Sequence, residues 1–139
     1  MERRSTQVAQ TRERILDAAL ELFSERGAQG TTMNELARRA DVSPTTVSNH
    51  FNTQESLIEA VVERILLESR VPDGTIFVGT RSVTGRLRIL TRSMFEFFER
   101  TMPWFDLLGA ELVEVPALAR AQAAFWRSIH QLHVQALAG

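Results

Sequence analysis

The sequence lacks cysteine, tyrosine and lysine, and it has only four prolines. Without cysteine the chain has no disulfide scaffold, no thiol nucleophile and no thiolate zinc site. No apolar run approaches the ~20 residues that a membrane-spanning helix needs, and the charged N-terminus lacks the apolar core of a signal peptide. We therefore expect a cytoplasmic protein that does not enter a membrane.

All sixteen basic residues are arginine. A G·C-rich genome is one explanation, and the arginine fork, which binds two phosphate oxygens at once, is another. The whole chain carries a net charge of −1. Residues 1–52 hold as many acidic as basic side chains. Any affinity of this part for DNA must therefore come from where the charges lie, because the total charge supplies none.

The length of 139 residues suits one hydrophobic core, or one core with a small appended domain. Apolar residues recur mostly at the three- and four-residue spacing of a helix, and strand-like alternation is rare. The sequence therefore predicts an all-α fold.

Residues 31–51 read as two short helices joined by a tight turn. Thr32 and Glu35 have the spacing of a capping box, in which each side chain bonds to the backbone N–H of the other residue. The apolar residues that follow fall on one stripe of the first helix: Met33, Leu36, Ala37 and Ala40.

The second helix begins at Ser43 and Pro44, an N-cap followed by proline at the first helical position, and runs to about Phe51. Val47 and Phe51 are its apolar anchors, so its short polar side chains have no core to enter. Such a helix suits a DNA major groove. Helix pairs of this kind also occur in proteins that never touch DNA, and these residues alone leave both readings open.

The surrounding residues carry a family resemblance. ILDAALELFSERGAQGTTMNELARRADVSPTTVSNHF, followed by ESLIEAVVE, resembles the N-terminal DNA-binding domain of the TetR/AcrR transcriptional regulators over residues 8–66. The resemblance implies a three-helix helix-turn-helix head that a fourth helix joins to a helical ligand-binding and dimerisation domain. Family members are longer than this chain and dimerise through two further helices, which would follow Gly139. The chain is thus either a truncated form or one that dimerises through other surfaces.

We place the helix-turn-helix domain at residues 1–52, the connecting helix at 53–70 and the C-terminal ligand-binding domain at 71–139. The first helix is expected from about Thr6 to Arg26, behind a polar tail, and Gly27 should end it in a left-handed conformation. The fourth helix should begin at Thr53, or at Asn52 if Asn52 and Glu55 form its capping box.

The resemblance also implies the DNA contacts. Base edges would be read by Pro44, Thr45, Thr46 and Asn49, with Asn49 the main discriminating residue because an amide pairs bidentately with adenine. Thr46 is also a candidate for a phosphate contact. The other candidates for phosphate contact are Thr32, Arg38, Arg39, Ser48, His50 and Gln54.

Several of these residues have another reading. The family often has tyrosine at position 48 and lysine at position 54, so Ser48 and Gln54 imply weaker anchoring on DNA. Arg38 and Arg39 equally suit ion pairs with Glu35 or Asp41, and His50 suits the start of the next helix. The polar tail with Arg3 and Arg4 is either a phosphate or minor-groove contact or a disordered segment.

Residues 71–85, rich in glycine, read as a loop with an extended segment. A helix is expected from Arg86 until an interruption at Thr101–Pro103, followed by a short segment to Leu108 and a last helix from about Pro116. Aromatic and methionine side chains gather in this part and suit a mostly apolar ligand. The candidate pocket residues are Met94, Phe98, Met102, Trp104, Phe105, Phe125 and Trp126, which equally suit packing against each other.

The sequence thus predicts a homodimeric regulator that binds a palindromic double-stranded operator and is released from it by a small apolar ligand. The alternative is a small-molecule-binding protein whose DNA-binding head is weak or vestigial. No residues at motif spacing indicate an enzyme or a cofactor. His130 and His133 have no carboxylate within a helical turn, so we expect no metal site.

Overall fold

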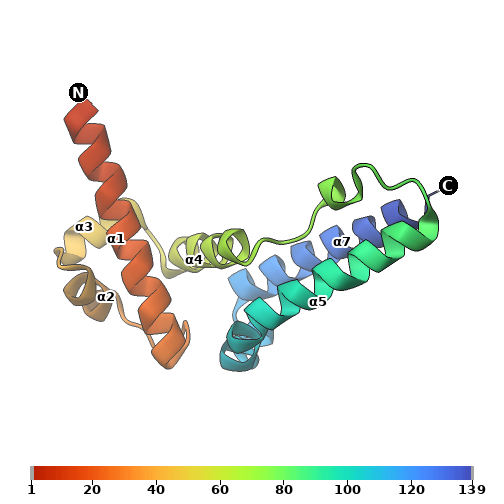
Figure 1. The fold of residues 1–139 in the computed structure, drawn as a ribbon. Coiled ribbons are helices and arrows are strands. Elements are labelled where there is room, and N and C mark those ends of the chain that lie inside the picture. Colours follow the sequence, from red (N-terminus) through yellow and green to blue (C-terminus); the bar gives the residue numbers. More distant parts are fainter. Residues whose placement is uncertain (1, 139) are drawn as a thin grey trace.

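The computed structural model describes residues 2–138, and within that range it holds helices and no strands, which confirms the all-α prediction. The helices are α1 (Glu2–Arg26), α2 (Met33–Ala40), α3 (Pro44–His50), α4 (Gln54–Ser69), the short 3-10 helix η1 (Gly74–Phe77), α5 (Val83–Leu108), α6 (Glu111–Glu114) and α7 (Pro116–Leu137). The first three helices form a head at one end of an elongated molecule (Figure 1). Helix α4 leads from this head to α5 and α7, which lie side by side and antiparallel.

The core of the head lies between α1 and the helix pair α2–α3. Helix α1 buries one stripe whose members recur at three- and four-residue spacing, and the pair buries its own apolar residues against that stripe. The α1 stripe consists of Ile15, Leu16, Ala19, Leu22 and Phe23. Leu36 of α2 and Val47 of α3 are fully buried against it. This packing fixes which side of α3 faces outward.

The predicted helix starts in the head are confirmed. The Thr32 hydroxyl accepts a hydrogen bond from the Glu35 N–H at 3.2 Å, and the Glu35 carboxylate accepts one from the Thr32 N–H at 3.2 Å. Helix α2 ends at Ala40, and its C-cap residue Asp41 has a left-handed φ of 56°. Ser43 then caps α3 by accepting from the Thr46 N–H at 3.1 Å. The chain therefore turns within three residues between the two helices.

The structure corrects the expected start of α1 and decides between the two expected starts of α4. The expected polar tail with Arg3 and Arg4 is wrong, because α1 already begins at Glu2. The buried stripe stabilises α1 from Ile15 onward. Residues 2–14 contain no proline or glycine, so nothing in them stops the helix from extending back to Glu2. At the start of α4, Thr53 is the N-cap and forms a capping box with Ser56, so the Asn52–Glu55 alternative does not form.

The expected interruption at Thr101–Pro103 is wrong. Helix α5 begins at Val83, earlier than expected, and continues through Pro103 to Leu108. Proline removes the N–H that would bond to the Glu99 carbonyl, which normally weakens a helix. Phe97, Thr101 and Leu108 lie on one face, at four- and seven-residue spacing, and all are buried. Their burial on both sides of the proline keeps the helix in one piece. The extended segment expected within 71–85 is a 3-10 helix instead.

The C-terminal half has a core of its own, centred on Phe97 of α5 and formed mainly with Phe125, Ile129, Leu132 and Ala136 of α7. The start of α7 contributes to the core of the head, because Ala117 and Leu118 pack with the buried residues of α1 and α4. The head and the C-terminal half therefore share apolar contacts as well as the connecting helix. No helix within residues 2–138 is both long and apolar enough to cross a membrane.

Candidate DNA-binding surface and ligand cavity

The outer side of α3 is a polar surface held from behind by two apolar anchors. Val47 is 0% exposed and Phe51 is 3% exposed. Because these two residues point into the head, the side chains on the opposite side of this short helix face solvent. The exposed residues there are Pro44, Thr45, Ser48 and Asn49. Thr46 is half-buried, and its hydroxyl lies 2.8 Å from the Ser43 hydroxyl.

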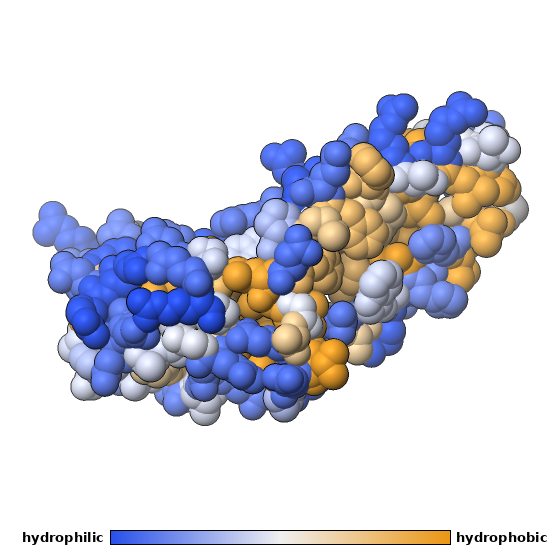
Figure 2. All heavy atoms as spheres, turned by 90° about the horizontal axis from the view of Figure 1, so that it is seen from below, coloured by the Kyte–Doolittle hydropathy of each residue, from blue (hydrophilic) through white to orange (hydrophobic). Residues whose placement is uncertain are grey.

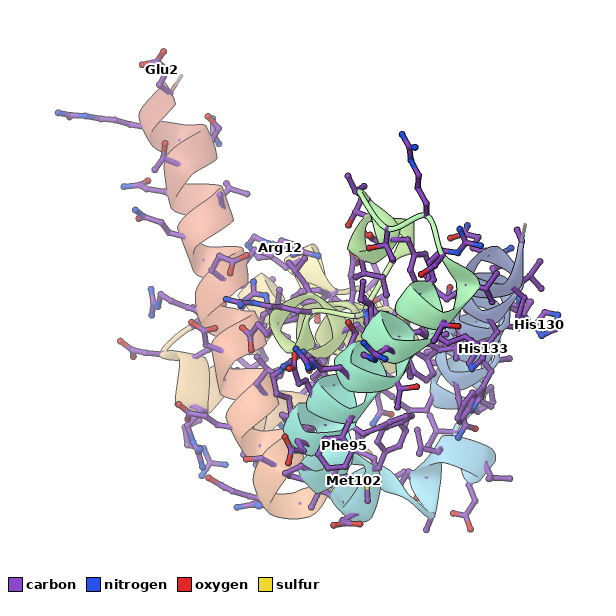
Figure 3. The ribbon with its side chains drawn as sticks, turned by 45° about the vertical axis from the view of Figure 1, so that its right-hand side comes forward. Glu2, Arg12, Phe95, Met102, His130 and His133 are labelled. Carbon is purple, nitrogen blue, oxygen red and sulfur yellow. The ribbon has the colours of Figure 1, made fainter. Side chains whose placement is uncertain are left out.

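Two arginines of α1 that sequence reasoning missed hold the helix pair α2–α3, one at the end of α2 and one at the end of α3. The Arg14 guanidinium donates to the carbonyl oxygens of Ala40 and Asp41 at 2.7 and 3.0 Å. The guanidinium of Arg12, which projects from α1 (Figure 3), lies over the Phe51 ring, 5.1 Å from its centroid. Such a cation–π contact stabilises by about 0.5 to 1 kcal/mol at an exposed site. Both arginines are distant in sequence from their partners, so no local pattern marks them.

The residues predicted to contact phosphate have different surroundings. Thr32 is exposed, but its hydroxyl also lies 3.1 Å from the Glu35 carboxylate. Arg38 is exposed and makes no ion pair within residues 2–138. Ser48 is exposed and His50 is half-buried. Arg38 and Ser48 are therefore the freest of this group to reach a phosphate.

Arg39 is held by two glutamates of α1. Its guanidinium donates to both carboxylate oxygens of Glu25 at 3.0 and 3.1 Å, and to Glu21 at 3.1 Å. The hydrogen bonds from Arg39 hold the pKa of the Glu25 carboxyl below its usual value. The same contacts, with Glu25 first and Glu21 second, raise the pKa of Arg39. The partners of Arg39 are thus neither Glu35 nor Asp41. Arg39 can contact DNA only if it breaks its bonds to Glu25 and Glu21.

Gln54 also binds within the protein. Its side-chain amide donates to the Ala28 carbonyl at 3.4 Å, so the first turn of α4 is tied to the loop after α1. The N–H groups of Ala28 and Gln29 donate to the Glu111 carboxylate of α6 at 2.7 and 3.1 Å. Gly27 has φ 75°, the left-handed conformation predicted for it, and a Cβ built there would lie 2.6 Å from Glu111 Oε1. The loop is therefore shaped to let Glu111 approach.

A mostly apolar cavity of about 70 Å³ lies where α4, α5, α6 and α7 meet, beside the head. The lining residues that matter here are Ile65 of α4, Phe97, Thr101, Trp104 and Phe105 of α5, Leu112 of α6, and Leu118, Gln122 and Phe125 of α7. The Thr101 hydroxyl donates to the Phe97 carbonyl at 2.9 Å, so it is already satisfied. The Gln122 amide makes no hydrogen bond within the described residues and is the polar group most open to a ligand.

The structure brings together only some of the residues predicted for a pocket. Trp104, Phe105 and Phe125 line the cavity. Met94 and Phe98 pack against the C-terminal core and do not line the cavity. Met102 and Trp126 are 47% and 50% exposed, and they too lie outside its lining.

Ion pairs also join α4 to α7. Arg120 of α7 forms ion pairs with Glu55 and Glu59, which lie one turn apart on α4. His130 and His133 lie at the outer end of α7 (Figure 3), and the described residues contain no group of three or more side chains suited to a metal ion.

A three-helix head with a helix-turn-helix and an outward polar recognition helix, joined to a helical C-terminal half, defines a DNA-binding class of protein. A family model described as "Bacterial regulatory proteins, tetR family" matches residues 15–61. A solved structure described as a TetR-family transcriptional regulator from Rhodococcus sp. has a TM-score of 0.66 and 31% identity, covering 92% of this chain and 71% of that one. The chain belongs to the TetR family.

Two curated relatives extend this likeness. The transcriptional regulator UidR of Escherichia coli is 39% identical over 83 residues, which are 56% of this chain and 42% of UidR. The transcriptional repressor Rv3405c of Mycobacterium tuberculosis is 30% identical over 128 residues, covering 76% of this chain and 66% of the repressor. This chain therefore matches less than half the length of UidR. By name these relatives are regulators of transcription, and none is an enzyme.

Proposed function

We propose that this chain is a DNA-binding transcriptional repressor that acts as a homodimer in the cytoplasm and releases its operator when a small apolar ligand binds. The single observation that carries the DNA-binding part is the outer side of α3, where Pro44, Thr45, Ser48 and Asn49 are exposed while Val47 is buried behind them. The similarity to a relative described as a transcriptional repressor supports repression, as opposed to activation, of transcription.

The roles of the α3 residues follow from their chemistry. Asn49 is exposed and offers both a donor and an acceptor, which match the N7 and N6 edge of adenine. Thr45 and Pro44 lie at the helix start and present apolar surface to a thymine methyl. Ser48 and Arg38 contact phosphate and set the register without reading sequence. Two such heads on a two-fold axis would read half-sites about 34 to 36 Å apart.

The remaining candidates for DNA contact contribute less in this arrangement. Arg39 is bound to Glu25 and Glu21, and Gln54 is bound to the Ala28 carbonyl. Contacts from either side chain to phosphate would first cost these internal bonds. We therefore expect fewer neutralised phosphates per head, and hence a modest dependence of DNA affinity on salt.

The cavity beside the head supplies the ligand site. Its apolar lining selects a flat or aliphatic molecule, and the Gln122 amide offers one orienting hydrogen bond. A volume of about 70 Å³ is well below the roughly 300 to 1,000 Å³ of sites for drug-sized ligands. A drug-sized ligand therefore fits only if α5 and α7 move away from α4. The ligand would favour an open conformer, and its differential affinity for the two conformers would set the strength of regulation.

A second candidate function is small-molecule binding with a vestigial head. The internal bonds of Arg39 and Gln54, both at positions predicted to contact phosphate, favour it. Salt distinguishes the two candidates, because a functional head releases counterions from DNA and loses affinity as salt rises.

The experiment that tests the proposal is selection of bound sites from random duplex DNA at low salt, followed by titration of the best site against salt. A palindrome with half-sites about one helical turn apart, bound less tightly as salt rises, supports the dimeric regulator. A folded protein that enriches no sequence would instead support the vestigial head.

A further inference from the structure

The first turns of α1 project beyond the rest of the head. Helix α1 extends past α3 toward the N-terminus (Figure 1), and Glu2 lies at its tip, away from the other helices (Figure 3). We call residues 2–10 the arm; all of them are exposed. The ten helical steps from Glu2 to Arg12 span ~15 Å. Because no residue of the arm is buried, the fold does not depend on it.

The charges of the head are divided between the arm and the remainder. Residues 2–12 hold three arginines and one carboxylate, whereas residues 13–52 hold four arginines and six carboxylates. Three of those four arginines are bound to oxygen atoms of the protein, namely Arg14, Arg26 and Arg39. Arg3 and Arg4 of the arm make no ion pair within residues 2–138. A head with equal numbers of acidic and basic residues therefore presents most of its free positive charge at the arm.

Two arginines show which side of α1 faces α3 and the turn before it. Arg14 donates to the Asp41 carbonyl at the start of that turn, and Arg12 lies over the Phe51 ring at the end of α3. Successive residues of a helix are rotated by ~100°, so Arg12 and Arg14 mark the two edges of this side. Arm residues that fall between the same edges, one to three turns further out, are Arg4, Gln7 and Val8. Arg3 lies within about 20° of the Arg14 edge.

We propose that the arm lies against the phosphate backbone of duplex DNA beside the bases that α3 reads. Arg3 and Arg4 bind phosphate oxygens, and Gln7 donates a hydrogen bond from the same side of the helix. A helix is ~10–12 Å across and the minor groove is ~6 Å wide, so the helical arm stays on the backbone and does not enter that groove. The proposal rests on the DNA binding of the proposed function, to which it adds phosphate contacts.

Charge and polarity favour phosphate as the partner. The face of the head that Figure 2 shows is mostly hydrophilic, whereas apolar side chains gather over the C-terminal half. Val8, at 53% exposure, is the only large apolar residue in the arm sequence, so an apolar partner would find little area there. The fork of an arginine binds two phosphate oxygens at once. The arm also continues the side of the head on which α3 presents its polar residues.

The test measures the affinity of the full chain for a mixed-sequence duplex of about 30 base pairs over a range of salt concentrations. One variant carries Arg3→Gln and Arg4→Gln. Each lost phosphate contact lowers the slope of log affinity against log salt by about 0.9, so we expect a slope lower by about 2 per head. The affinity should fall at least about tenfold at ~0.1 M salt. Arg88→Gln with Arg92→Gln, at exposed positions of α5, makes the same charge change and should leave both values as in wild type.

A second pair of variants tests which side of the arm meets DNA. Gln7→Glu adds a negative charge on the side that faces α3. Ala9→Glu adds the same charge ~200° further around the helix, at an equally exposed position. Glutamate is a good helix former at both positions, so the variants differ mainly in the side of the charge. Because charges are screened over ~10 Å at 0.1 M salt, Gln7→Glu should lower the affinity at least about threefold more than Ala9→Glu.

Circular dichroism shows whether each variant keeps its helices. The arm proposal alone is overturned if wild type binds the duplex and the variant at Arg3 and Arg4 binds it with the same affinity and slope, or if Gln7→Glu and Ala9→Glu act alike. A variant at Arg3 and Arg4 that keeps its duplex binding but no longer binds vesicles containing phosphatidylserine would overturn it in favour of a lipid surface. A wild-type chain that binds no duplex at low salt would overturn the proposed function as well.

Discussion

The Glu111 carboxylate of α6 accepts a hydrogen bond from the Ala28 N–H of the head at 2.7 Å, across 83 positions of sequence. The neighbouring residue Leu112 lines the cavity. Any movement of α6 that enlarges the cavity therefore acts on the loop between α1 and α2. The same loop also receives the Gln54 amide at the start of α4. Three backbone polar groups of this loop, the N–H groups of Ala28 and Gln29 and the Ala28 carbonyl, thus bond to two other helices.

Replacing Glu111 by alanine should loosen the head from the C-terminal half. The variant leaves the Ala28 and Gln29 N–H groups without their acceptor, and hydrogen bonds to a charged group contribute about 1.5 to 3 kcal/mol each when buried. Because this loop is only partly buried, we expect a loss of about 1 to 2 kcal/mol in the free energy of unfolding. Urea unfolding measures this loss of stability. Faster amide hydrogen exchange at Ala28 and Gln29 would show that the loss arises at these two N–H groups.

Glu114→Ala is the matched control, since Glu114 lies on the same short helix, is exposed and accepts no hydrogen bond within residues 2–138. It should change the stability by less than about 0.5 kcal/mol. Equal effects of the two variants would mean that the Glu111 contact contributes nothing specific.

Replacing Asn49 by alanine should relax operator discrimination and leave the fold intact. The side chain is exposed, so its removal creates no cavity, while the loss of a bidentate contact with adenine costs about 1 to 3 kcal/mol against the preferred base. Binding to operators changed at one base pair at a time measures the effect. Asn52→Ala, just beyond α3, is the control. Unchanged discrimination in Asn49→Ala would remove the base-reading role from this residue.

Replacing Glu25 by glutamine should strengthen DNA binding. The change weakens the hold on Arg39 and removes one negative charge from the head, so Arg39 becomes available for phosphate. We expect higher affinity for any duplex and a steeper dependence on salt, by up to about one further counterion. Asp106→Asn makes the same charge change at an exposed position in α5. If both variants behave alike, Arg39 has no part in the effect.

Acid should destabilise the head partly through Glu35. Hydrogen bonds from Arg26, and then from the Thr32 N–H, hold the pKa of the Glu35 carboxyl below its usual value of 4.5. A carboxyl whose pKa is lower in the folded state stabilises the fold above the unfolded value, and this contribution falls as pH drops through the folded value. The difference in unfolding temperature between wild type and Glu35→Gln should therefore be present at neutral pH and shrink below about pH 4.5. A difference that does not change with pH would contradict this reading.

Local chemistry was enough to predict the parts of the head that lie close together in sequence. The Thr32–Glu35 capping box, the Ser43–Pro44 start and the left-handed Gly27 each depend on a few neighbouring residues, and each is confirmed. The outer side of α3 followed from the two anchors Val47 and Phe51.

The features that sequence reasoning missed depend on contacts between distant residues. Local preference at Pro103 indicates a break, but burial of Phe97 and Leu108 on either side keeps α5 continuous. The partners of Arg39 lie 14 and 18 residues away on another helix, and helical spacing within α2 does not reveal them. The cavity likewise depends on how four helices meet.

Leu118 tests whether the head and the C-terminal half fold as one unit. It is 1% exposed, packs in the core of the head and also lines the cavity. Leu118→Ala should therefore lower the free energy of unfolding by about 2 to 5 kcal/mol, whereas Leu67→Ala, at a position that is 73% exposed, should change it by less than about 0.5 kcal/mol. Urea unfolding followed by both tryptophan fluorescence and circular dichroism measures the two variants. Because Trp104 and Trp126 lie in the C-terminal half, a shift seen by both probes together shows that the shared core couples the halves. A transition that moves for circular dichroism alone would mean that the head unfolds independently.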